Sequence, residues 1–116
     1  MTVALKYGRD ANSLNAYAPK PSDTIFNALL ASGVEQSITL PGAADENYCV
    51  AFRFESGSNV FVDVTGAAAV SPTGAFAAST CELNPTSLTL PGGASISMIS
   101  PSGTAYVSVI SWRIGK

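Results

Sequence analysis

Acidic side chains are the groups in this sequence that could do chemistry, and they gather in two places. Residues 45–47 read Asp-Glu-Asn, and these oxygen-bearing side chains could bind calcium, although the spaced ligands of an EF-hand loop are lacking. Glu55 and Asp63 could be the acid and base of a glycosidase, which needs carboxyl groups roughly 5–9 Å apart. A solvated turn, and a surface salt-bridge patch with Arg53 on the same face as Glu55, explain the two groups more simply.

Histidine is absent from the chain, and this limits the chemistry further. Ser-His-Asp and Cys-His nucleophile pairs and histidine-containing zinc sites are excluded, and the commonest general base is missing. The two cysteines, Cys49 and Cys81, cannot fill a four-thiolate zinc site, and whether they form a disulfide or stay reduced is open. We therefore expect no catalytic residues, no cofactor and no bound metal, and we expect that the protein is not an enzyme.

The composition is apolar and weakly charged. Of the 116 residues 47% are hydrophobic and only 12% are charged, and the net charge is −2. This balance excludes a strongly basic nucleic-acid-binding surface and a charge-rich disordered chain. No apolar run approaches the ~20 residues of a membrane helix, and the first residues lack the apolar segment of a signal peptide. We expect a product folded in the cytoplasm, with neither nucleic acid nor a membrane as its partner.

Alternating side chains predict β-strands from residue 36 onward. Two runs, 48–55 and 59–64, each place their aromatic or β-branched residues on one face, as half-buried strands do. A three-residue loop between them would make a hairpin with Phe52 opposite Val62, whereas a two-residue loop would move side chains to the wrong faces. The outward sides of this hairpin carry two candidate interface residues, Arg53 and Phe61.

A repeat relates the two parts of this β-rich region. Residues 37–44 (Ser-Ile-Thr-Leu-Pro-Gly-Ala-Ala) recur fifty residues later at 87–94 (Ser-Leu-Thr-Leu-Pro-Gly-Gly-Ala). Each copy opens a strand-turn-hairpin unit, at residues 36–66 and 87–114. One unit cannot bury its own apolar face, so the two should pack on each other. The sequence therefore predicts an all-β domain over residues 35–116, a small antiparallel β-sandwich or flattened barrel of six to eight strands.

Residues 1–34 differ from the rest and are expected to form an extended N-terminal arm, with at most one short strand, at 3–7. Residues 22–31 could open a helix or form an extended segment with Ile25, Asn27 and Leu29 on one side, and the pattern leaves this open. An arm of this kind can add a strand to the sheet edge of a neighbouring protein. Its expected contact residues are Val3, Leu5, Tyr7, Arg9, Tyr17, Pro19, Lys20 and Pro21.

Several motifs together resemble a group of phage proteins. The Leu-Pro-Gly strand at 37–44 precedes an aromatic hairpin that begins Tyr-Cys-Val-Ala-Phe-Arg-Phe, and a loop then leads to Glu-Leu-Asn-Pro at 82–85. A Ser-Ile-Ser-Met-Ile-Ser-Pro run at 95–101 follows, and the last strand ends in Trp112. The pattern is similar to that of small structural proteins of tailed bacteriophages, which resemble capsid decoration (cement) proteins in size and composition.

The resemblance implies a virion protein that is made in the host cytoplasm and sits on the outer surface of the phage head, where it reinforces capsomer junctions. It implies that the major capsid protein is a partner. It also implies that the protein is a homo-oligomer, of which a trimer is one form. A receptor- or glycan-binding module of a head or tail fibre is the alternative, and it would use the tips at residues 56–59 and 101–104 with an aromatic ring stacked on sugar. Copy number per particle distinguishes the two.

Overall fold

A computed structural model describes residues 23–115 of the chain. Within this range the backbone forms eight β-strands and no helix, which confirms the all-β prediction. The strands are β1 (Thr24–Leu30), β2 (Gln36–Thr39), β3 (Asn47–Phe54), β4 (Phe61–Asp63), β5 (Cys81–Leu83), β6 (Ser87–Pro91), β7 (Ser95–Ile99) and β8 (Ala105–Gly115). The strand expected at residues 3–7 lies outside the described range.

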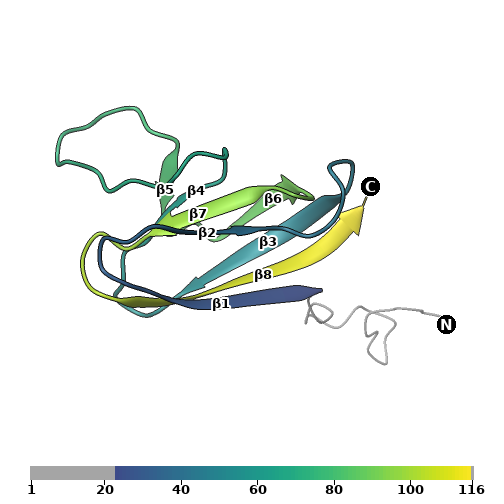
Figure 1. Cartoon of the computed structure of the whole chain (residues 1–116), viewed down its shortest axis with the longest axis horizontal. Coiled ribbons are helices and arrows are strands. Elements are labelled where there is room, and N and C mark those ends of the chain that lie inside the picture. Colours follow the sequence, from purple (N-terminus) through teal and green to yellow (C-terminus); the bar gives the residue numbers. More distant parts are fainter. Residues whose placement is uncertain (1–22, 116) are drawn as a thin grey trace, which may run out of the picture.

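The strands form two four-stranded antiparallel sheets, in the orders β1-β8-β3-β6 and β2-β7-β4-β5. The first strand pairs with the eighth, the second with the seventh, the third with the sixth and the fourth with the fifth. Residues 24–115 therefore form one long ribbon of paired strands, rolled up so that β8 also pairs with β3 and β7 with β4. This is the topology of a jelly roll. The connection between β4 and β5 forms the tip of the ribbon and projects from the strands in Figure 1.

The sandwich begins at Thr24, not at residue 35 as expected. β1 pairs with β8 along its whole length, from Thr24 opposite Ser111 to Leu30 opposite Ala105. The segment that could have been a helix is therefore a strand. Its inward residues alternate with exposed ones, as a strand at the edge of a half-buried sheet requires.

The two expected hairpins do not form. β3 pairs with β6 and β8, whereas β4 pairs with β5 and β7, so these consecutive strands lie in different sheets. The same holds for β7 and β8. The expected inward faces are nevertheless right, since Phe52 and Val62 are both buried in one core. They belong to opposite walls of that core instead of to neighbouring strands of one sheet.

Asn84 explains locally why the chain crosses between the sheets after β3. Its side chain accepts a hydrogen bond from the Val60 amide (2.8 Å) and donates one to the Ser58 carbonyl (3.1 Å). Its own amide donates to the Val60 carbonyl (2.8 Å). Asn84 has a φ of 45°, in the left-handed region that asparagine tolerates better than most residues. The backbone before β4 is therefore tied to the β5–β6 connection and cannot continue a hairpin with β3.

The sequence repeat occupies equivalent strands of the jelly roll. If each strand is replaced by the one four places away in the chain, the order β1-β8-β3-β6 becomes β5-β4-β7-β2, which is the other sheet read in reverse. β2 and β6 therefore occupy equivalent positions, and they are the strands of the two repeat copies. The turns that follow them meet: Leu40 and Ala94 are joined by an amide-to-carbonyl hydrogen bond of 2.9 Å, and the Gly93 amide donates to the Leu40 carbonyl at 3.1 Å. The two units interlock, because β3 lies between β6 and β8 while β7 lies between β2 and β4.

The contact between the two turns allows a direct test at Gly92. A Cβ there would lie 2.3 Å from the carbonyl oxygen of Ala43 and 2.9 Å from the carbonyl carbon of Gly42, both backbone atoms. We expect Gly92→Ala to lower the free energy of unfolding in urea by about 1–3 kcal/mol, as overpacking does. Gly115→Ala adds its methyl group in open space and is the matched control. Equal stability of the two variants would contradict the close approach of the turns.

Candidate interaction surfaces

The outer face of the sheet β1-β8-β3-β6 is unusually apolar for a surface. On β1 the side chains of Ile25 and Leu29 are 55% and 48% exposed, and on β8 Tyr106 is 64% exposed. Side chains alternate along a strand, so the half-buried residues of β8 between its buried ones also point outward. We call the following set the apolar face: Ile25, Leu29, Tyr106, Ile110, Trp112 and Ile114.

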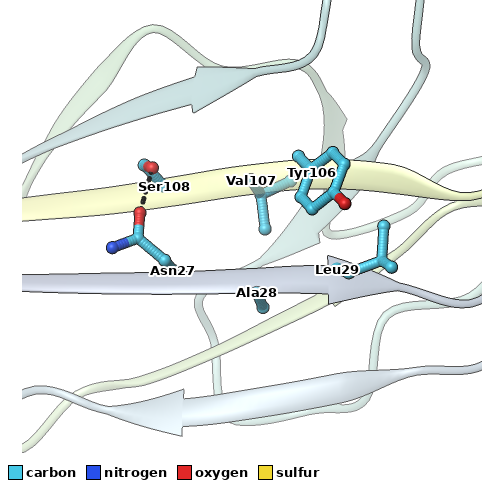
Figure 2. Close-up of a pocket in the computed structure, with 6 residues that line it drawn as sticks. All are labelled: Asn27, Ala28, Leu29, Tyr106, Val107 and Ser108. Carbon is cyan, nitrogen blue, oxygen red and sulfur yellow. Dashed lines mark hydrogen bonds between the residues drawn. The ribbon is translucent and has the colours of Figure 1, made fainter.

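A shallow hollow lies within the apolar face, on the paired strands β1 and β8. Its volume is about 450 Å³ and it is lined by Asn27, Ala28, Leu29, Tyr106, Val107 and Ser108. Figure 2 shows Leu29 beside Tyr106 at one end and Asn27 hydrogen-bonded to Ser108 at the other. The hollow thus presents an apolar pair and a polar, uncharged pair next to each other.

Charged groups near this face are few, and several are paired. The Glu55 carboxylate accepts a hydrogen bond from the Tyr106 amide (3.1 Å), while the Arg113 guanidinium lies 3.3 Å from the Glu46 carboxylate. Arg53, one of the two interface residues expected from the sequence, is exposed on β3 beside Ser108. Arg113 is in step with the buried Val107 and Val109 of β8 and so lies on the other side of the sheet, whereas Arg53 is an exposed cation on β3 beside the apolar face.

Phe61, the other expected interface residue, lies on the opposite sheet. It was expected to share an outward surface with Arg53 on one hairpin, which is wrong because β3 and β4 are in different sheets. Phe61 lines two adjoining hollows of about 320 and 560 Å³. The smaller hollow also contains Asn59, Pro101 and Ser102. The two tips that the sequence singled out for sugar binding thus meet beside an aromatic ring.

The carboxylates of Glu55 and Asp63 are not brought together as an acid/base pair. Asp63 is on β4 of the other sheet, with 2% of its surface exposed. It accepts hydrogen bonds from the amide (2.8 Å) and hydroxyl (2.6 Å) of Thr65, from the Thr80 hydroxyl and from the Cys81 thiol (3.7 Å). Burial raises the pKa of Asp63, but these hydrogen bonds, those of Thr65 first, outweigh it and hold the pKa below its usual value. Asp63 therefore joins both ends of the long β4–β5 loop.

Of the remaining chemistry-bearing residues, Glu46 has structural partners and the two cysteines are not joined in a disulfide. In the turn at residues 45–47, Glu46 accepts a hydrogen bond from the Ala43 amide (3.0 Å) in addition to its ion pair with Arg113. Within residues 23–115 no three His, Cys, Asp or Glu side chains are grouped so that they could hold a metal ion. Cys49 and Cys81 are both free thiols, on β3 and β5 of different sheets.

The expected arm contacts lie outside the described residues, so the structure places none of them: Val3, Leu5, Tyr7, Arg9, Tyr17, Pro19, Lys20 and Pro21. The sequence predicted only part of the apolar face. Ile25 and Leu29 were seen to share a side if the segment was extended, but their position next to β8 comes from a pairing across most of the chain.

The chain has no detected similarity to known proteins, so its fold and its surfaces are what bear on its function. No family model, no curated protein and no solved structure matches this chain. In the part of the chain that the structure describes, no helix is long and apolar enough to cross a membrane.

Acid should weaken the fold through Asp63. Because its pKa is lower in the folded than in the unfolded protein, its stabilising effect is complete above the unfolded value near 4 and is lost as the pH falls through the folded value. We expect Asp63→Asn to lower the free energy of unfolding at pH 7 by about 1.5–3 kcal/mol and to flatten its fall as the pH drops below the unfolded value. Urea unfolding across this range measures both effects.

Glu82→Gln is the matched control, because it removes an exposed carboxylate from the neighbouring strand β5. Its pH profile should follow that of the unmodified protein. Superimposable profiles for Asp63→Asn and the unmodified protein would contradict the role given to the buried carboxylate.

Proposed function

We propose that this chain is a phage virion structural protein, a capsid decoration protein that binds the major capsid protein on the outer surface of the head. The observation that carries the proposal is the apolar face of the sheet β1-β8-β3-β6. Contiguous exposed apolar patches on small proteins mark interaction sites, because leaving them in water costs free energy. A broad and weakly charged face suits a partner that is itself a broad protein surface.

The arrangement of the chain supports attachment through this face. β8 is the longest strand of the described residues and lies inside its sheet, so Tyr106 and Ile110 stand on a rigid platform. A rigid platform loses little conformational entropy when it binds. On a capsid lattice, many such contacts of modest strength can act together when copies are linked.

The jelly-roll topology is compatible with the proposal and does not decide it. Jelly rolls occur in viral capsid proteins, lectins and cupins, and one fold serves many functions. The support therefore comes from the surface, together with the resemblance of the strand and turn motifs to phage structural proteins.

Quantitative mass spectrometry of purified particles tests the proposal. We expect a ratio of this chain to the major capsid protein near one copy per capsid subunit or per capsomer. Tyr106→Ser should weaken binding to particles that lack the protein about tenfold, since an aromatic contact in an interface is worth on the order of 1–2 kcal/mol. Phe76→Ser is the matched control, because Phe76 is a fully exposed aromatic residue on the β4–β5 loop. Absence of the chain from particles, or equal effects of the two substitutions, would contradict the proposal.

A second function is favoured by a different observation, the paired hollows around Phe61. Their lining is uncharged and combines an aromatic ring with amide and hydroxyl groups, including those of Asn59 and Ser102. Neutral sugars are bound in this way, with a ring stacked on an aromatic side chain and hydroxyls hydrogen-bonded around it. This arrangement supports the alternative of a receptor- or glycan-binding module on a head or tail fibre.

Glycan-array binding separates the alternative from the capsid proposal. If the alternative holds, the protein should bind a neutral glycan, and Phe61→Ala or Asn59→Ala should weaken that binding by about tenfold or more. Tyr106→Ser, on the opposite face, should leave it unchanged. The particle would then contain only a few copies of the chain. No binding to any neutral glycan would remove this second function.

A further inference from the structure

The sandwich has four edge strands, and β1 differs from the other three. It is seven residues long, whereas β6, β2 and β5 have five, four and three residues. Its sequence, Thr-Ile-Phe-Asn-Ala-Leu-Leu, contains no charge, no proline and no glycine, and its register with β8 has no irregularity. Charges, prolines and bulges are the features with which natural sheets protect exposed edges from pairing. β1 has none of them, whereas β6 contains Pro91 and β5 contains Glu82. No strand of the described residues pairs with the outer side of β1.

The hydrogen-bonding phase of β8 determines which groups of β1 face outward. The Glu55 amide donates to the Tyr106 carbonyl (2.9 Å), so Tyr106 and every second residue after it bond to β3. The alternate residues of β8 face β1, and the Ser111 carbonyl accordingly accepts from the Asp23 amide (2.8 Å). The residues of β1 opposite them, at positions 24, 26, 28 and 30, therefore direct their backbone amides and carbonyls toward β8. The amides and carbonyls of Ile25, Asn27 and Leu29 are therefore directed away from the sheet.

This outward edge is complementary to itself. If a second copy pairs antiparallel about a two-fold axis at Asn27, then Asn27 lies opposite the second copy's Asn27 and Ile25 opposite the second copy's Leu29. These are the residues whose backbone groups point outward, so three hydrogen-bonded pairs with two bonds each would form, about six bonds in all. A two-fold interface needs a patch that matches itself in this way.

Side chains on both faces of β1 fit the same pairing. On the inner face Phe26 would lie opposite the second copy's Ala28, and both are only half-buried at the edge of the core. On the outer face the second copy's Ile25 would lie beside Leu29, next to the hollow of about 450 Å³ that Leu29 and Tyr106 line. Pairing therefore buries apolar surface on both sides of the new ladder and gives the outer backbone groups of β1 hydrogen-bond partners.

We propose that the chain forms a two-fold dimer through antiparallel β1–β1 pairing centred on Asn27, which joins two four-stranded sheets into one continuous eight-stranded sheet. The dimer does not depend on the proposed capsid function and can hold or fail separately. Its consequence is a doubled apolar face on one side of the joined sheet.

Substitutions at the two-fold axis test the dimer on the full-length chain. In Asn27→Lys two ammonium groups, and in Asn27→Asp two carboxylates, would face each other across the axis. Like charges directly opposite are unfavourable in a sheet, so each variant alone should dissociate about tenfold or more readily than the unmodified protein. An equimolar mixture of the two variants should form a heterodimer, because the opposed charges are then opposite in sign. Native mass spectrometry and light scattering over a concentration series measure the oligomeric state of the unmodified protein, of each variant and of the mixture.

The matched controls are Ser87→Lys and Ser87→Asp, at an exposed position on β6, the other edge of the same sheet. They should dimerise like the unmodified protein. Recovery in the mixture excludes misfolding as the cause of dissociation, since a misfolded chain would not be rescued. An unmodified protein that is monomeric at all concentrations would overturn the proposal. Oligomers that dissociate on substitution of Ser87, or that are unchanged by a charge at residue 27, would also overturn it.

Discussion

The pairing of β8 with β1 on one side and β3 on the other is the interaction on which the rest of this structure depends. β8 runs from Ala105 to Gly115 and is the last strand of the described residues, and it lies between β1, the first of them, and β3, so the sheet cannot close without it. Its inward residues, Val107 and Val109 among them, are buried in the core, while its outward residues form most of the apolar face. One strand thus contributes to the stability of the fold and to the surface that we connect with function. Because the pairing spans most of the chain, its loop-closure entropy must be offset by burial of the whole core.

Polar residues hold together the parts of the chain that are not strands. Asp63 ties the two ends of the β4–β5 loop, Asn84 ties the crossing before β4, and Glu46 ties a turn to β8 through Arg113. Within the described residues every buried side-chain nitrogen and oxygen has a hydrogen-bond partner. In a chain with so few charges, the carboxylates of Glu46, Glu55 and Asp63 satisfy backbone donors that the jelly roll would otherwise leave unpaired.

The two outer faces of the sandwich are chemically different. The sheet β1-β8-β3-β6 presents an open and largely apolar surface, whereas the outer side of β4 is overlaid by the β4–β5 loop, which leaves uncharged hollows around Phe61. A protein with this division could attach through one face while the other remains accessible to solvent. Sheet continuation through β1 would extend the apolar face without covering the hollows, because the hollows lie on the other sheet.

From residue 36 onward the sequence by itself indicated most of the strands and which way their side chains point, since period-two alternation is a local property of the extended backbone. It left the segment that forms β1 open between helix and strand. The inward direction of Tyr48, Val50 and Phe52 and the equivalence of the two Leu-Pro-Gly segments could be seen without coordinates. Only the tertiary structure decided which strands are neighbours. Residues 48–54 and 60–64 present apolar faces that fit equally well as a hairpin or as opposite walls of a core, and the choice between them depends on Asn84 and β8, far away in the sequence. The placement of Arg53 and Phe61 on opposite faces follows from that choice, because a side chain's direction is set locally but its sheet is set by long-range pairing.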